Sequence, residues 1–221
     1  MALVKTNQGF YAGGTPGNSN ISFNFNNLGG GDEFLMALVM FKNRTSAISQ
    51  PTYGGDVMNQ FFQYNNNNFR VAVFGLLNPS SGVNQFFQAA SGQWNPVSVT
   101  LTSFSGSSGF GVRNQNLTNA VNNTTTLTGL TTGSMIQGYG MATNTTANAR
   151  IQIPTGTTRT REWRHNVTDW FWGATSPVLS VSSSTVRSYG GASWTQSRTG
   201  GIEIKASGST PPTRRRRIII N

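Results

Sequence analysis

This sequence of 221 residues contains no cysteine, one histidine and only six acidic residues. The absence of cysteine excludes disulfide bonds, thiolate nucleophiles and cysteine-based zinc sites. Stability must therefore come from packing or from assembly with other subunits. Charged residues make up 10% of the chain, against roughly a quarter in an ordinary soluble domain, so amide and hydroxyl groups supply most of the polar surface.

The shortage of ionisable side chains leaves little material for catalysis. The one histidine, His165, lies four residues before Asp169, but no nucleophile-elbow pattern accompanies the pair. A glycosidase needs two carboxylates facing each other across a cleft, which composition alone does not exclude. Turn and ion-pair roles fit the carboxylates better, because Asp32 and Glu33 follow a glycine turn and Glu162 is flanked by arginines. We expect a protein that is not an enzyme.

Metal and cofactor signals are equally sparse. Oxygen ligands from Asp32 and Asn26/Asn27 would suit calcium, but no EF-hand or repeated calcium loop surrounds them. The Gly29-Gly30-Gly31 run lacks the lysine and the following helix of a phosphate-binding loop. We therefore expect neither a metal nor a cofactor.

No hydrophobic run is long enough to cross a bilayer. The longest, FLMALVMF at residues 34–41, spans 8 residues, whereas a membrane helix needs about 20. The first residues, MALVKTNQG, lack the apolar stretch of a secretory signal. These features predict synthesis in a cytoplasm and no membrane partner.

The net charge of +10 is unevenly distributed. Arg214, Arg215, Arg216 and Arg217 carry four of these charges, which leaves 12 basic and 6 acidic residues, or +6, on the remainder. Binding of nucleic acid usually requires a stripe of Lys and Arg interleaved with aromatics, or a recognition helix. Neither pattern is present, so we do not expect a nucleic-acid partner.

What the sequence does contain is a series of short strand-like segments separated by Gly, Pro and Asn. Residues 21–25 alternate apolar and polar side chains, and residues 34–41 are continuously apolar, as in a central strand that is buried on both faces. Further strands are expected at 69–77, 97–104, 124–130, 135–141, 149–153, 178–181, 185–189, 193–196 and 202–204. Short strands at near-regular spacing predict an all-β, antiparallel β-sandwich of the jelly-roll or immunoglobulin-like kind.

Three regions follow from this pattern. Residues 1–20 are expected to form an N-terminal arm or edge segment, residues 21–205 one sandwich, and residues 206–221 a flexible linker and docking arm. The linker contains Gly, Ser and the pair Pro211-Pro212, which favour an extended, mobile segment.

The C-terminal arm combines the four arginines with Ile218, Ile219 and Ile220. Arginine runs neutralise phosphates, so a nucleic-acid tail is one interpretation. Three β-branched apolar residues instead favour docking on a protein partner, with the arginines holding carboxylates.

A second candidate contact is the aromatic cluster formed by Trp163, Trp170 and Trp172 near several arginines. Such rings could stack on a glycan or on bases, but they equally suit core or subunit packing. We interpret them first as packing or subunit contacts and second as a glycan site.

Several turns resemble those of a β-sandwich module found in bacteriophage structural proteins and some bacterial surface proteins. The similarity rests on PTYGGDVM at 51–58, FGLLNPSSG at 74–82, SFSG at 103–106 and the final GIEIK at 201–205. It implies a non-enzymatic virion protein, most simply a capsid decoration or cement protein that contacts the major capsid protein or other virion subunits. A homo-oligomer is expected, with a trimer as one option. The alternative is a tail fibre or spike that binds host surface glycans.

Overall fold

The computed structural model describes residues 2–13, 20–28, 33–42, 48–65, 69–89, 97–116, 123–143, 150–152, 158–160, 163–166, 169–189 and 197–208. These residues form eighteen strands and no helix. Accordingly, the described part of the chain offers no apolar helix of membrane-spanning length. The all-β, antiparallel sandwich expected from the sequence is confirmed.

The first nine strands form a complete jelly roll. Successive strands from the two ends of this segment pair antiparallel, β1 with β9, β2 with β8, β3 with β7 and β4 with β5, while β6 is added beside β7. The pairs assemble into a five-stranded sheet of order β1-β9-β3-β7-β6 and a four-stranded sheet of order β2-β8-β4-β5. This double-sheet arrangement is the jelly-roll form of the β-sandwich, not the immunoglobulin-like form. The strands are β1 (Val4–Gly13), β2 (Ile21–Asn27), β3 (Phe34–Lys42), β4 (Thr52–Tyr53), β5 (Asp56–Val57), β6 (Asn59–Asn65), β7 (Phe69–Leu77), β8 (Gly82–Gln88) and β9 (Val97–Ser105).

The second nine strands repeat the first nine. Adding nine to every strand number of the first half gives the sheets β10-β18-β12-β16-β15 and β11-β17-β13-β14, which are those observed. The chain is therefore a tandem of two jelly rolls joined at Gly106. The second set comprises β10 (Ser107–Asn116), β11 (Asn123–Thr128), β12 (Met135–Thr143), β13 (Arg150–Gln152), β14 (Thr158–Thr160), β15 (Trp163–Asn166), β16 (Asp169–Thr175), β17 (Ser183–Tyr189) and β18 (Ser197–Ala206).

The repeat extends to individual hydrogen bonds. In β1, the Asn7 side chain accepts from the N–H of Gln8 at 2.8 Å and donates to the carbonyl of Asn26 in β2 at 2.6 Å. In β10, Asn114 accepts from the N–H of Gln115 at 2.8 Å and donates to a carbonyl in β11 at 2.7 Å. In both halves, an asparagine side chain of the first strand thus donates a hydrogen bond to the four-stranded sheet.

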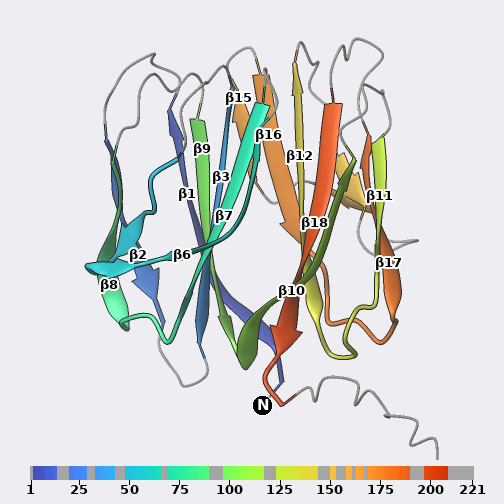
Figure 1. The fold of residues 1–221 in the computed structure, drawn as a ribbon, viewed down its shortest axis with the longest axis horizontal. Helices are drawn as coiled ribbons and strands as arrows, with labels where there is room; N and C mark the ends of the chain where they lie inside the picture. Colours follow the sequence, from blue (N-terminus) through green and yellow to red (C-terminus); the bar gives the residue numbers. More distant parts are fainter. Residues whose placement is uncertain are drawn as a thin grey trace, which may run out of the picture.

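The four sheets stack as layers, with the two five-stranded sheets in the centre (Figure 1). Strand β3 lies in a central sheet, and every residue from Phe34 to Phe41 is buried. Its even-numbered residues face the other half of the molecule and its odd-numbered residues face the four-stranded sheet of its own half. The prediction of a strand buried on both faces is confirmed.

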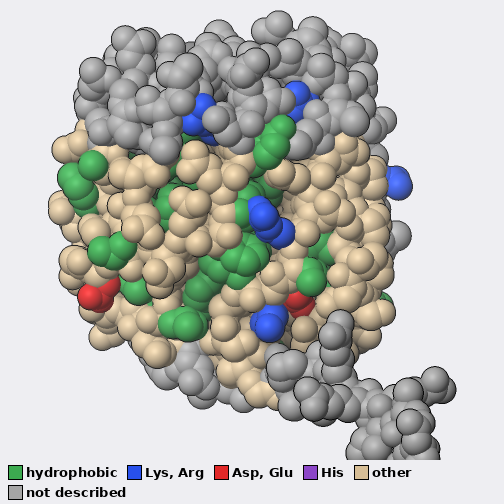
Figure 2. All heavy atoms as spheres, in the orientation of Figure 1, with side chains coloured by type: hydrophobic (Ala, Val, Ile, Leu, Met, Phe, Trp, Pro, Cys, Tyr) green, Lys and Arg blue, Asp and Glu red, His purple; other side chains and the backbone are tan. Residues whose placement is uncertain are grey.

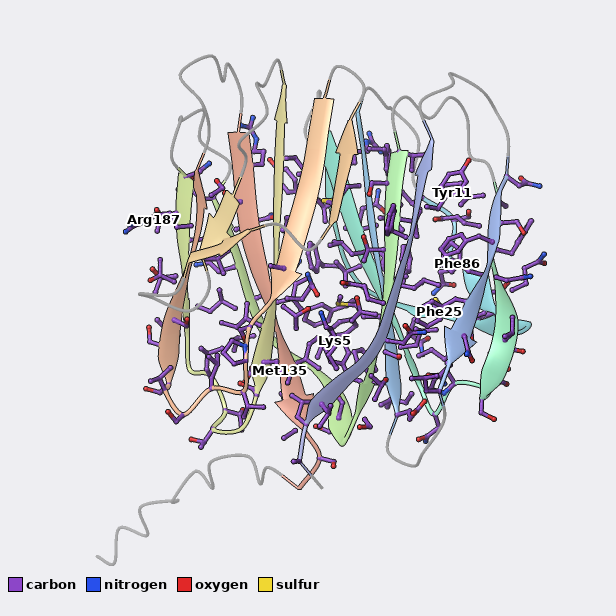
Figure 3. The ribbon with its side chains drawn as sticks, turned by 180° about the vertical axis from the view of Figure 1, so that it is seen from behind. Lys5, Tyr11, Phe25, Phe86, Met135 and Arg187 are labelled. Carbon is purple, nitrogen blue, oxygen red and sulfur yellow. The ribbon has the colours of Figure 1, made fainter. Side chains whose placement is uncertain are left out.

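Three apolar cores fill the spaces between the four layers. The core between the sheets of the first half includes Phe25 and Phe86, which point inward in Figure 3, whereas Arg187 points away from the outer strand β17. The core between the sheets of the second half is smaller. The central core joins the halves and contains Leu3, Phe34, Met36, Leu38, Met40, Phe62, Val71, Val73, Phe104, Met135, Tyr139, Met141, Ile202 and Ile204.

The expected regions agree with the structure only in part. Residues 4–13 form an edge strand of the first five-stranded sheet, which is the edge-segment alternative for the N-terminal region, because β1 pairs with β9 along its length. Residues 21–205 hold parts of two sandwiches rather than one. The strand predicted at 178–181 is wrong, since this segment is an irregular connection between β16 and β17. The strand expected at 193–196 lies outside the described residues.

Two predicted turns are confirmed by their backbone angles. Gly54 and Gly55 join β4 to β5 with φ values of 59° and 93°, which suit the two-residue hairpin turn that requires positive φ at both positions. Gly82 begins β8 with a φ of 81°. Both positions favour glycine because L side chains are strained there.

Candidate functional site

The two jelly rolls meet along a seam. There the edge strand β10 of the second half lies close to β7 and β3 of the first half, and β6 is the edge strand beside β7. A pocket of about 360 Å³ opens on this seam, which we call the seam groove. Figure 2 views the molecule from this side and shows apolar side chains gathered across its middle. The groove is lined by Phe34, Asn59, Gln60, Phe61, Gly75, Leu76, Leu77, Ser108, Gly109 and Phe110.

Irregularities in both edge strands shape the groove. The register of β6 against β7 shifts between Gln60 and Phe62, so an extra residue is inserted at this point. The register of β10 against β18 shifts between Phe110 and Arg113. Such bulges redirect side chains and terminate regular pairing at sheet edges. Here they let the consecutive residues Phe61 and Phe62 both pack against the central core.

Gly75 is required at the base of the groove. A Cβ atom at this position would lie 2.6 Å from Phe110 and 2.7 Å from the ring of Phe34. Without that Cβ, the Phe34 and Phe110 rings pack edge to face with centroids 4.6 Å apart, and Phe61 stacks on Phe110 at 4.3 Å. The groove wall is therefore a rigid set of three aromatic rings.

A cation closes one end of this aromatic wall. The guanidinium carbon of Arg113 lies 4.3 Å from the ring centroid of Phe62 and 5.7 Å from that of Phe61, within the range of cation–π attraction. Beside it, a second pocket of about 240 Å³ is lined by Phe62, Arg113, Asn114, Gln115 and Tyr139. Burial raises the pKa of Tyr139, whose hydroxyl donates to Gln115 at 3.1 Å, so this phenol stays neutral.

The seam groove is lined by apolar and neutral polar groups. Its lining contains aromatic faces, two amide side chains and one hydroxyl, but no acid, base or cation. That hydroxyl, of Ser108, donates to the carbonyl of Ala206 at 3.2 Å and has no adjacent base to activate it. The arrangement suits a flat or apolar group with a polar rim, such as an apolar side chain of a partner or a sugar ring.

Ionisable clusters are absent elsewhere in the part of the chain that the structure describes. No three side chains among its His, Asp and Glu residues come together in a way that could hold a metal ion. Arg70 and Arg198 are buried, and burial lowers the pKa of both. These side chains are therefore not exposed for chemistry.

The residues predicted from the sequence are only partly placed. Strand β15 pairs with β16 so that Arg164 lies opposite Trp172 and Asn166 opposite Trp170, while Trp163 lies opposite Gly173. The three tryptophans thus share one hairpin at the edge of a central sheet. Their side chains, and that of His165, lie outside what the structure describes.

The docking arm formed by Arg214, Arg215, Arg216, Arg217, Ile218, Ile219 and Ile220 also lies outside the described residues. Sequence reasoning missed the seam groove altogether. Two signals could have drawn attention to it, the consecutive phenylalanines 61 and 62 and the Gly-Phe-Gly sequence at 109–111, because glycines around an aromatic residue often mark a close approach. Comparisons of the chain with protein-family models, with curated proteins and with solved structures gave no match.

Proposed function

We propose that this chain is a non-enzymatic structural protein of a bacteriophage particle, of the capsid-decoration type, which binds neighbouring capsid subunits. The tandem jelly roll is the observation that carries the proposal. Jelly rolls serve as building blocks of viral shells and of lectins, and two copies in one chain present two sets of similar surfaces. The partner would be the major capsid protein or another virion subunit.

The edge strand β1 supports a role in assembly. It is ten residues long, forms one outer edge of the five-stranded sheet, and carries a single charged residue, Lys5. Phe10 on the same strand is 60% exposed. Sheet edges in monomeric proteins usually carry charges, prolines or bulges, and β1 has such features only at its start, in Lys5 and the bulge between Lys5 and Asn7. The rest of the strand suits pairing with a neighbouring subunit.

The chemistry of the surface points the same way. Of the three acidic side chains whose burial the structure describes, Asp56 alone is exposed, and Figure 2 shows few charged groups among amide, hydroxyl and backbone atoms. Contacts made by such groups depend little on ionic strength. A protein fixed permanently to a particle benefits from that independence.

The direct test is quantitative mass spectrometry of purified particles separated into heads and tails. We expect the protein in the head fraction at a fixed ratio to the major capsid protein. Detection in tails alone would favour the appendage alternative, and absence from both fractions would reject a virion role.

A matched pair of variants tests the edge strand. Phe10→Lys places a charge on β1, whereas Val83→Lys places the same charge on the 65% exposed Val83 of β8, which lies inside its sheet. We expect Phe10→Lys to lower occupancy on particles and Val83→Lys to leave it unchanged. Equal effects of the two variants would show that β1 has no special part in assembly.

The seam groove favours one second candidate, binding of a host glycan by a tail appendage. Its stacked phenylalanines and flanking amides are the groups that hold sugar rings. Gln60→Ala removes an amide of the lining without touching the aromatic wall. A glycan array on which the wild-type chain binds and this variant does not would support the appendage function.

A further inference from the structure

Two buried glutamates of this chain have opposite surroundings. Glu203 is 1% exposed, and its carboxylate accepts hydrogen bonds from the backbone N–H groups of Val112 at 2.8 Å and Thr131 at 2.6 Å. Glu33 is 3% exposed, yet neither of its carboxylate oxygens has a hydrogen-bond partner. Burial of an unpaired carboxylate is strongly unfavourable.

A third oxygen without a partner belongs to Asn27. This residue is fully buried, and its amide nitrogen makes two long contacts of 3.4 Å to the carbonyls of Pro79 and Ser80. Its side-chain oxygen has no donor. Two different residues therefore present buried oxygen acceptors that receive no hydrogen bond.

The fold brings these two residues to the same place. The carbonyl of Glu33 accepts from the N–H of Asn78 at 2.8 Å, so Glu33 and Asn27 both contact the 78–81 turn. Glu33 lies two residues before Leu35, whose side chain belongs to the core between the two sheets of the first half, and strand alternation places Glu33 on that face. Asn27 is the last residue of the inward-facing series of β2. Both side chains thus enter the same end of the first jelly roll.

Tyr53 marks this end of the sandwich independently. Its hydroxyl donates to the carbonyls of Phe25 at 3.0 Å and Gly82 at 3.2 Å, and Gly82 is the residue opposite Asn27 in the β2–β8 pair. Burial is the main cause that raises the pKa of Tyr53, and the negative charge of Glu33 contributes to the increase. Glu33 therefore lies within electrostatic reach of the Tyr53 hydroxyl.

We propose that Glu33 and Asn27 bind a hard cation, Ca²⁺, at this end of the first jelly roll, together with backbone carbonyls of the 78–81 turn. The available donors are all oxygens, which calcium prefers, and they combine a carboxylate, an amide and carbonyls, as calcium sites commonly do. A single carboxylate gives a weak site, with a dissociation constant on the order of 10⁻⁴–10⁻³ M. This proposal departs from the sequence expectation of no metal.

The second jelly roll supplies a natural comparison. Ser134 precedes β12 as Glu33 precedes β3, and its carbonyl accepts from the N–H of Leu179 at 2.8 Å, as that of Glu33 accepts from Asn78. A serine at this position provides no charge. The proposal therefore predicts one calcium ion per chain, and Ser134→Ala is the matched control for Glu33→Gln.

The first measurement is thermal unfolding of the full chain in CaCl₂ and in EGTA. At a calcium concentration about a hundred times the dissociation constant, we expect the wild type and Ser134→Ala to melt about 5–10 °C higher than in EGTA. Glu33→Gln should lose this increase. Asn27→Asp adds a second carboxylate, so its melting temperature should be lower than that of the wild type in EGTA and should rise more steeply with calcium.

The second measurement uses Tb³⁺ as a luminescent substitute for Ca²⁺. Tyr53, which lies near the proposed site, is excited and transfers its energy to the bound Tb³⁺. We expect luminescence that calcium displaces and that Tyr53→Phe and Glu33→Gln each abolish. A wild type that melts at the same temperature in calcium and in EGTA would overturn the proposal. An equal calcium response in the wild type and Glu33→Gln would also overturn it. If Glu33→Gln does not fold, the test is Asn27→Asp, and a melting temperature that rises with calcium no more steeply than that of the wild type would overturn the proposal.

Discussion

Because the central core is shared by both jelly rolls, the two halves should unfold together. Leu35 and Leu38 allow a clean test, since both lie on β3, both are fully buried, and they face opposite sides. Leu35 contacts the core within the first half, whereas Leu38 contacts the core between the halves. Leu35→Ala and Leu38→Ala therefore delete the same group on either side of one sheet.

Each substitution removes a buried leucine side chain and leaves a cavity, which costs about 2–5 kcal/mol. For a chain of this length, each kcal/mol lowers the melting temperature by roughly 2–4 °C, so a decrease of about 5–15 °C is expected for both variants. Urea should give the same loss of free energy with an unchanged dependence on denaturant, provided that unfolding remains a single transition.

Fluorescence and circular dichroism together show whether the two jelly rolls unfold in one transition or independently. Four of the five tryptophans, at positions 163, 170, 172 and 194, belong to the second half, so tryptophan fluorescence reports mainly on that half. Far-UV circular dichroism reports on both. We expect both signals to shift together in both variants. If Leu35→Ala leaves the tryptophan transition at the wild-type midpoint while part of the dichroism is lost earlier, the halves unfold independently and the coupling argument fails.

Three further substitutions test individual contacts. Gly200→Ala would place a Cβ atom 2.2 Å from the buried ring of Tyr139, so a large loss of stability in urea unfolding is expected, and wild-type stability would contradict this packing. Glu203→Gln removes a charged acceptor from two backbone N–H groups, and we expect a loss of about 1.5–3 kcal/mol by the same assay, whereas no loss would mean that these bonds contribute nothing. The pKa of Tyr53 is raised in the folded chain, so the neutral phenol stabilises the fold fully below about pH 10, and this contribution is lost as pH rises further. Urea unfolding at several pH values should therefore show a shallower alkaline loss in Tyr53→Phe than in the wild type, and equal slopes would refute the assignment.

The sequence was most informative where one physical requirement fixes the residue type. A strand covered by a sheet on each face needs apolar residues at every position, and residues 34–41 satisfy this without interruption. A two-residue hairpin with positive φ needs glycine, which Gly54 and Gly55 provide. In both cases few other structures would use the same residues.

The internal repeat was hidden because a jelly roll tolerates different residues at equivalent positions. Strand β12 occupies the place of β3. It contains Gln137 and two glycines at positions where β3 has apolar residues. Gln137 is tolerated in the interior because it accepts from the Thr175 hydroxyl at 2.9 Å and donates to the carbonyl of Ala174 at 3.2 Å. Topology is thus preserved by hydrogen bonds that a hydrophobic pattern does not register.

The seam groove could not be predicted for a different reason. Its aromatic wall comes from β3, β6 and β10, which belong to two jelly rolls, and its shape depends on how those halves pack. Gly75 looks like one more glycine in a turn motif until Phe34 and Phe110 are placed against it. A site made by the contact between repeats has no signature in either repeat alone.

The four-layer stack also determines which surfaces can meet a partner. Each five-stranded sheet is covered on one face by the four-stranded sheet of its own half and on the other face by the five-stranded sheet of the other half. Neither sheet therefore offers a free face. Partners must therefore use the outer four-stranded sheets, the sheet edges or the ends of the strands. Strand β1 is an edge with an exposed Phe10, and the seam groove lies between two other edges, β6 and β10. The contact between the two halves has thus covered one broad face of each five-stranded sheet, and the outer sheets, the edges and the strand ends are the surfaces that remain.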